Sequence, residues 1–232
     1  MTSILPRPAV QHPTLPEPDL PLVHDRTYSA RAYRKSDTEL LIRGQIQDQK
    51  PPGLYVDHDP DPLTIHHMVL DITIELPALV ITEAEMVMET HPHAGCTSIT
   101  DHYKQLVGLS IARGFSRKVR ELFGGPRGCT HTTALLQAMA PVAIQSIWSM
   151  QASAQRAAGG TPVPTPLPSD PTDEQIRERF AHNLNTCHVW REDGEMLDGL
   201  RRGESMEPPL WVVERLNQLG MDVGKWDSPF SD

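Results

Sequence analysis

The segment that decides the fold is residues 65–76, which read IHHMVLDITIEL. Its apolar side chains occupy alternate positions: Met68, Leu70, Ile72, Ile74 and Leu76. Polar side chains lie between them, with Val69 as the exception. This alternation is typical of a half-buried antiparallel strand. His66 opens the apolar face and His67 lies on the other face. The segment therefore predicts a sheet with one buried side and a histidine at one end of that side.

Further strands are predicted on both sides of this segment. Residues 26–33 and 40–47 precede it, and residues 79–88 return after a turn at Pro77 and Ala78. Beyond residue 95 the apolar period becomes helical, which predicts helices at 99–106, 115–122 and 130–150. Because the strands come first and the helices follow, the order indicates an α+β fold, a short antiparallel sheet covered by helices.

Proline is enriched, with 22 prolines among 232 residues against roughly 5% on average. This enrichment and the local composition predict four divisions of the chain. They are a Pro-rich flexible arm (1–23), an α+β metal-binding core domain (24–150), an Ala/Gly/Pro linker (151–172) and a C-terminal helical extension (173–232). The extension is predicted to hold helices at 172–185, with Thr172 as its cap, and at 208–219.

The composition excludes several classes of protein. With 21 Lys and Arg against 30 Asp and Glu, the net charge is −9, which argues against nucleic-acid binding. No apolar run is long enough for a membrane span, and residues 1–21 lack the apolar core of a secretory signal. Three cysteines do not make a disulfide framework. We therefore expect a cytoplasmic protein with reduced thiols.

Residues 124–131, GGPRGCTH, carry the most informative local pattern. Glycines surround Cys129 where a helix is predicted to start, and a helix N-terminus favours the thiolate form of a cysteine. His131 follows two residues later, so both side chains are within reach of one metal ion. The alternative interpretation is a glycine-rich helix start with a buried cysteine.

Two more residues complete a predicted metal set. Cys96 also follows a glycine at a helix start, although a lone cysteine is more often a small buried apolar residue. His66 shares the apolar face of its strand, where a core histidine is the commoner outcome. Together Cys96, Cys129, His131 and His66 would supply two cysteines and two histidines to zinc.

Other polar residues have simpler interpretations. His91 and His93 are alternative ligands in what reads as a polar loop, and Cys187-His188 reads as a partly buried pair. Asp48 and Lys50 end a strand and are interpreted as a surface ion pair.

The chain resembles the uncharacterised bacterial family named domain of unknown function 2889. The resemblance rests on short segments at 26–28, 48–50 and 106–108, on His66-x-Met68, on Cys96, and most specifically on residues 124–131. It extends over about residues 24–150, and more weakly over residues 186–190. The family name implies no activity.

A second, more distant resemblance is to iron–sulfur scaffold proteins of the NifU/IscU type. Cys96 and Cys129 are similar to the second and third cysteines of those proteins. The first has no counterpart, since Thr64 stands there and His66 replaces the aspartate. The resemblance implies an IscU-like sheet covered by helices. Loss of one thiolate and gain of imidazoles favours zinc over a transferable cluster.

These observations predict a metal-binding protein with zinc as the expected ion and an iron–sulfur cluster as the weaker alternative. A metal with an open position suits a hydrolase, hydratase or lyase acting on a small acidic or phenolic compound. His66 and His131 are the candidate catalytic residues where they are not ligands. The alternatives are a non-enzymatic metal or iron–sulfur carrier, and an interaction subunit of a multi-component enzyme. A small-molecule ligand, a protein partner and a homo-oligomer are all compatible with the sequence.

Overall fold

The computed structural model describes residues 18–112, 114–159, 167–168, 170–181, 183–204, 206 and 209–223. It contains a four-stranded antiparallel sheet in the order β1-β2-β3-β4. The strands are β1 (Asp25–Arg34), β2 (Glu39–Lys50), β3 (Leu63–Glu75) and β4 (Val80–Thr90). They cover the four predicted segments, so the strand predictions are confirmed.

One face of the sheet is closed by apolar side chains, as the alternation in β3 predicts. The two central strands contribute seven apolar side chains that are each at most 2% exposed: Leu40, Ile42, Ile46, Met68, Leu70, Ile72 and Ile74. Ile81 of β4 is buried to the same degree. Gly44 lies among them in β2. A Cβ atom at Gly44 would lie only 2.4 Å from the sulfur of Met139, so a helix approaches the sheet as closely as the backbone allows.

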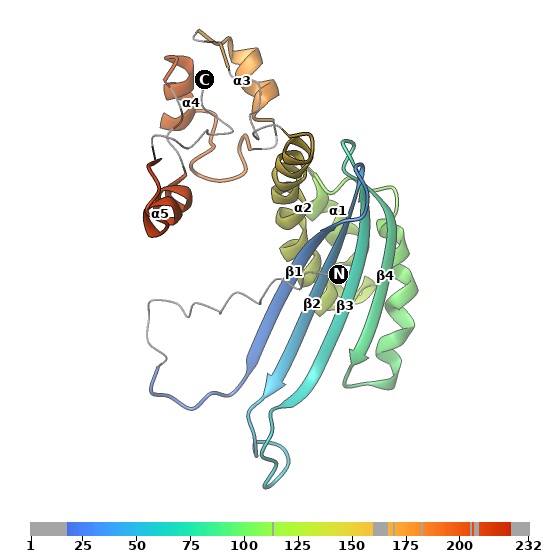
Figure 1. Ribbon diagram of the computed structural model, residues 1–232. Coiled ribbons are helices and arrows are strands. Elements are labelled where there is room, and N and C mark those ends of the chain that lie inside the picture. The colour runs from blue at the N-terminus through green and yellow to red at the C-terminus, as the bar shows by residue number, and fades with distance from the viewer. Residues whose placement is uncertain are drawn as a thin grey trace.

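The helices that cover this face are η1 (Ala94–Leu106, a 3-10 helix), α1 (Phe115–Phe123), the single turn η2 (Gly125–Arg127) and α2 (Thr130–Ala157). The long helix α2 lies across β1 and β2, and η1 lies along β4 (Figure 1). The α+β prediction is confirmed. The predicted third helix is longer than expected and continues through Ala157, so the first seven residues of the predicted linker are helical.

The C-terminal part of the described chain has its own small core. It contains α3 (Asp173–Arg179), α4 (Glu195–Arg201) and α5 (Leu210–Gln218). Thr172 caps α3 in a reciprocal capping box with Gln175, as its sequence predicts. The helix is shorter than predicted because the chain leaves it at Phe180 and forms turns. The predicted apolar stripe is nevertheless buried, together with two leucines of α4: Ile176, Phe180, Leu184, Leu197 and Leu200.

Several predicted divisions fall partly outside the described residues. Residues 1–17 of the predicted arm and residues 160–166 of the predicted linker lie outside them, whereas residues 18–24 are exposed and precede the first strand. Within the described ranges, no helix combines the length and the apolar character needed to cross a membrane. The division into domains, like the IscU-like architecture, stays a prediction.

Candidate metal centre

The register of the sheet builds a row of polar side chains across three strands. Arg26 of β1 pairs with Asp48 of β2, and Asp48 pairs with His66 of β3. The ladder between β2 and β3 shifts immediately after Asp48, where Gln49 pairs with Thr64. Such a bulge re-aims side chains and is common beside functional sites. At this end of the sheet, charged side chains and an imidazole ring therefore replace the apolar side chains of the buried face.

Asp48 is the centre of this row and is only 1% exposed. The Nε atom of Arg26 donates to Oδ1 at 2.5 Å, and its Nη2 atom donates to Oδ2 at 2.7 Å. This two-pronged hydrogen bond holds the pKa of Asp48 well below its usual range, against the opposing effect of burial. The same contact raises the pKa of Arg26. Asp48 is therefore an ionised carboxylate in the interior.

Two histidines converge on one oxygen of this carboxylate. His66 Nδ1 lies 3.0 Å and His131 Nε2 lies 3.1 Å from Asp48 Oδ2. The two rings are tilted against each other with their centroids 3.9 Å apart. Burial is the main cause that lowers the pKa of His131, followed by the charge of His66. His131 is therefore neutral at neutral pH, the state in which an imidazole binds a metal or accepts a proton.

The start of α2 places His131, and Tyr103 of η1 fixes that start. The Tyr103 hydroxyl accepts a hydrogen bond from the Cys129 amide at 2.8 Å and donates one to the Cys129 carbonyl at 3.2 Å. Tyr103 is buried and stacks on Phe123. The Cys129 sulfur lies 3.7 Å from His131 Nδ1. The two nitrogens of His131 thus face different groups, a carboxylate and a thiol.

The ligand atoms of Asp48, His66 and His131 lie within 4.8 Å of one another, so the three residues could hold one metal ion. In a tetrahedral zinc site with bonds of about 2.0–2.1 Å, neighbouring ligand atoms are about 3.3 Å apart. The separations of 3.0 Å and 3.1 Å between the carboxylate oxygen and the two ring nitrogens are close to that value. The donor set is two imidazoles and one carboxylate.

The structure brings together part of the predicted set. The rings of His66 and His131 lie against each other, and Cys129 lies beside His131. Cys96 lies partly buried against the main core and is absent from the ligand group found among the described residues. In the sequence, Cys96 is expected here from its position at a helix start and from its resemblance to a cysteine of NifU/IscU-type scaffolds. Its role as a ligand stays a prediction.

Asp48 corrects the sequence interpretation. The predicted surface ion pair with Lys50 is wrong, because Asp48 is buried and its partner is Arg26. A signal for this was present in the sequence. Asp48 has the same parity as Leu40, Ile42 and Ile46, so the alternation in β2 places it on the buried face. A carboxylate at such a position requires partners.

The remaining candidates lie apart from this group. His91 contacts the His93 carbonyl through Nδ1 at 3.0 Å, and both belong to the segment between β4 and η1. Cys187 is exposed, which contradicts the prediction of a partly buried pair with His188. His24 precedes β1 and places Nε2 3.5 Å from Asp48 Oδ1, a contact that the sequence analysis missed.

Comparison with known proteins gives one match. A family model described as "Protein of unknown function (DUF2889)" matches residues 24–145, a range that contains Asp48, Arg26, His66 and His131. No curated protein and no solved structure matches the chain. The resemblance to NifU/IscU-type scaffolds therefore has no support from these comparisons.

Proposed function

We propose that this chain, which belongs to the DUF2889 family, binds a divalent metal ion through Asp48, His66 and His131. The observation that carries the proposal is the convergence of two imidazole nitrogens on one buried carboxylate oxygen. Zinc is the ion we expect, because two histidines and one carboxylate form a known catalytic zinc set. Three protein ligands leave a position open for water or a substrate oxygen.

The surrounding residues support this assignment. Arg26 holds the carboxylate through Oδ1 as well as Oδ2, so it orients Asp48 while Oδ2 faces the histidines. His131 Nε2 faces the centre, and its Nδ1–H would donate to the Cys129 sulfur. A metal-bound histidine commonly donates its other N–H to an acceptor, which fixes the tautomer. In this arrangement Cys129 orients a ligand.

The charge of the centre suggests the class of substrate. The charges of Asp48 and Arg26 cancel, and an imidazole that binds a metal is neutral, so a divalent ion would leave a net positive centre. The side chains of His24 and Arg26, which both contact Asp48, are partly exposed to solvent. An anionic oxygen would be attracted there. We therefore propose a hydrolase, hydratase or lyase acting on a small acidic or phenolic compound, with the metal acting as a Lewis acid.

Metal content by elemental analysis tests the proposal, on full-length protein purified without a metal-affinity tag. We expect about one ion per chain in the wild type and a loss of it in His66→Ala and in His131→Ala. His67→Ala is the matched control, because His67 is the next residue along β3 and pairs with Glu89 at 2.6 Å instead. Metal retained in His66→Ala, or lost equally in His67→Ala, would overturn the assignment.

The two cysteines belong in the same experiment. If Cys129 only orients His131, Cys129→Ser should keep the ion with affinity reduced about tenfold or more, as for other groups behind a ligand. Cys96→Ser tests the ligand role predicted from the sequence. Complete loss of the ion in both variants would favour the two-cysteine, two-histidine set over the site that contains Asp48.

A second candidate function is nucleophilic catalysis by Cys129. One observation favours it: the sulfur faces His131 Nδ1 at 3.7 Å while His131 Nε2 faces Asp48 at 3.1 Å, the order of groups in a cysteine, base and carboxylate triad. The Cys129 sulfur would attack an acyl carbon, its proton would pass to Nδ1, and the leaving group would depart with that proton. Water would then hydrolyse the thioester.

The two candidates require opposite tautomers of His131, and different variants separate them. The metal centre needs His66, whereas the triad needs Cys129 and does not use His66. We expect alkylation of Cys129 by iodoacetamide, followed by peptide mass spectrometry, to be unaffected by His66→Ala in metal-free protein. Two results together would favour the triad. The purified wild type would carry no metal, and Cys129 would be alkylated more slowly in His131→Ala than in the wild type.

A further inference from the structure

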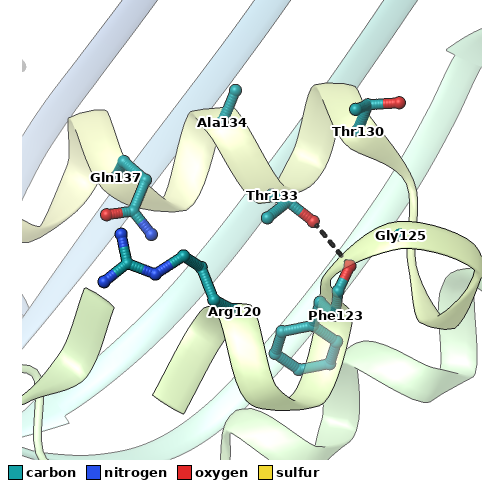
Figure 2. A pocket seen from close by; sticks show the side chains of 7 residues that line it. All are labelled: Arg120, Phe123, Gly125, Thr130, Thr133, Ala134 and Gln137. Carbon is teal, nitrogen blue, oxygen red and sulfur yellow. Dashed lines mark hydrogen bonds between the residues drawn. The ribbon is translucent and has the colours of Figure 1, made fainter. Parts of the chain in front are cut away.

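A second, separate site lies on the other side of the start of α2. A cavity of about 280 Å³ opens between α1 and α2 (Figure 2). Its lining residues are Arg120, Phe123, Gly125, Thr130, Thr133, Ala134 and Gln137. None of them belongs to the group around Asp48, although Thr130 precedes His131 in the same helical turn.

The cavity holds one buried hydrogen-bond donor without an acceptor, because the Nε2 atom of Gln137 has no hydrogen-bond partner among the described residues. The exposed side chain of Arg120 points toward the Gln137 amide in Figure 2. Among the described residues, no carboxylate lies within ion-pair distance of Arg120, and neither Asp nor Glu lines the cavity. A buried N–H without a partner destabilises the folded state, so such a group calls for an explanation.

Other polar side chains near the cavity do have hydrogen-bond or ion-pair partners, in contrast to the Gln137 amide. Arg127 donates from Nε to the Glu121 carbonyl at 2.9 Å and from Nη2 to the Arg120 carbonyl at 3.2 Å, so it closes the end of α1. The Thr133 hydroxyl donates to the Phe123 carbonyl at 3.2 Å, as the dashed line in Figure 2 shows. On α1 itself, Arg117 and Lys118 both pair with Glu121.

The rest of the lining combines apolar groups with two threonines, of which Thr133 already donates to the Phe123 carbonyl. Phe123, which is almost fully buried, and Ala134 supply the apolar part. A ligand that fits both parts has a negatively charged, two-oxygen acceptor on a small apolar body. One carboxylate oxygen would accept from the Arg120 guanidinium, and the other would accept from Gln137 Nε2. We infer that this cavity binds a small organic carboxylate whose apolar part lies against Phe123.

Calorimetric titration of full-length, metal-free protein with sodium benzoate tests the inference, with neutral benzamide as the matched probe. We expect benzoate to bind and benzamide to bind at least about tenfold more weakly, as for loss of a charge-assisted hydrogen bond. Arg120→Gln and Gln137→Leu should each weaken benzoate binding by a similar factor. Arg117→Gln should leave it unchanged, because that side chain is exposed on the same helix and pairs with Glu121.

The site must also be independent of the proposed metal centre. We expect His66→Ala, which removes a proposed ligand of that centre, to bind benzoate as the wild type does. Loss of benzoate binding in His66→Ala with normal binding in Arg120→Gln would place the carboxylate at the metal centre and overturn the inference. Failure of folded wild type to bind benzoate, butyrate and acetate alike would also overturn it.

Discussion

The first turns of α2 present two sides that contrast in packing and in charge. The side that faces the sheet is filled: Met139 reaches the backbone at Gly44, and each group around Asp48 has a partner. The side that faces α1 is hollow, with a cavity and an unpaired amide. The same helix therefore stabilises the fold on one side and leaves space for a ligand on the other.

The difference shows how the two sides would recognise their ligands. On the sheet side, Arg26 and the two histidines already contact the Asp48 carboxylate, so a ligand must replace existing contacts. On the α1 side, the donors are present before any ligand arrives. Donors that are already in place favour binding of an anion without rearrangement, whereas the sheet side is suited to an ion that binds the histidines in place of their hydrogen bonds.

The largest effect is expected from breaking the charge balance on the sheet side. Arg26→Met leaves the Asp48 carboxylate buried without its cation and should lower the free energy of unfolding by about 3 kcal/mol. The control is Arg43→Met, which removes a similar two-pronged pair with Asp71 on the exposed face and should change stability little. Urea denaturation measures both. Equal losses would mean that burial of Asp48 has no energetic consequence.

The filled packing is tested next by Gly44→Ala. The new methyl group would meet the Met139 side chain at 2.4–2.7 Å and the Leu135 side chain at 3.1 Å, so the helix or those side chains must move. We expect a loss of about 1–3 kcal/mol, typical of overpacking. Gly44→Ala combined with Met139→Ala should recover part of it. No recovery in the double variant would show that the cost comes from the β2 backbone instead.

On the side of α2 that faces α1, a substitution should increase the free energy of unfolding instead of lowering it. Gln137→Leu removes a buried N–H that has no acceptor within the described part of the chain, and it should raise the free energy of unfolding by about 1 kcal/mol in ligand-free protein. The same variant should bind benzoate less well, so stability and binding change in opposite directions. A destabilised Gln137→Leu would mean that the amide already has a partner, and the contrast between the two sides would be weaker.

The smallest effect is expected from pH. Because the pKa of His131 is lowered in the folded state, the unfolded chain binds more protons just below the ordinary histidine value of 6.5. Stability should therefore fall as the pH falls through that value. Asp48, whose pKa is also lowered, adds a further loss below about pH 4. Urea denaturation at pH 7.5 and 5.5 should show a smaller difference in His131→Gln than in the wild type.

The sequence predicts the sheet well because alternation is a local signal. The register of Arg26, Asp48 and His66 is not local, since it depends on how three strands align. The parity of Asp48 in β2 is visible in the sequence, but its pairing with Arg26 on another strand is not. His131 was identified from its spacing to Cys129. Its meeting with His66 needed α2 to lie across the sheet, which no spacing encodes.

The same reasoning explains what the sequence leaves open. Cys96 and Cys129 share a local pattern, a glycine followed by cysteine at a helix start, yet Cys129 contacts His131 and Cys96 packs against the core. The cavity beside α2 has no local signal, because Arg120 and Gln137 are ordinary helix residues in separate helices. Only the approach of α1 to α2 leaves the Gln137 amide without an acceptor.

The row that joins β1, β2 and β3 to the start of α2 also has a consequence for folding. Its members range from residue 26 to residue 131, so the centre exists only after distant parts of the chain have come together. Contacts of such long sequence separation form slowly. An ion bound only by the assembled centre would stabilise the native state by about 2.7 kcal/mol at a hundredfold excess over its dissociation constant. During refolding, the moment at which the chain begins to bind the ion would therefore report when α2 has docked onto the sheet.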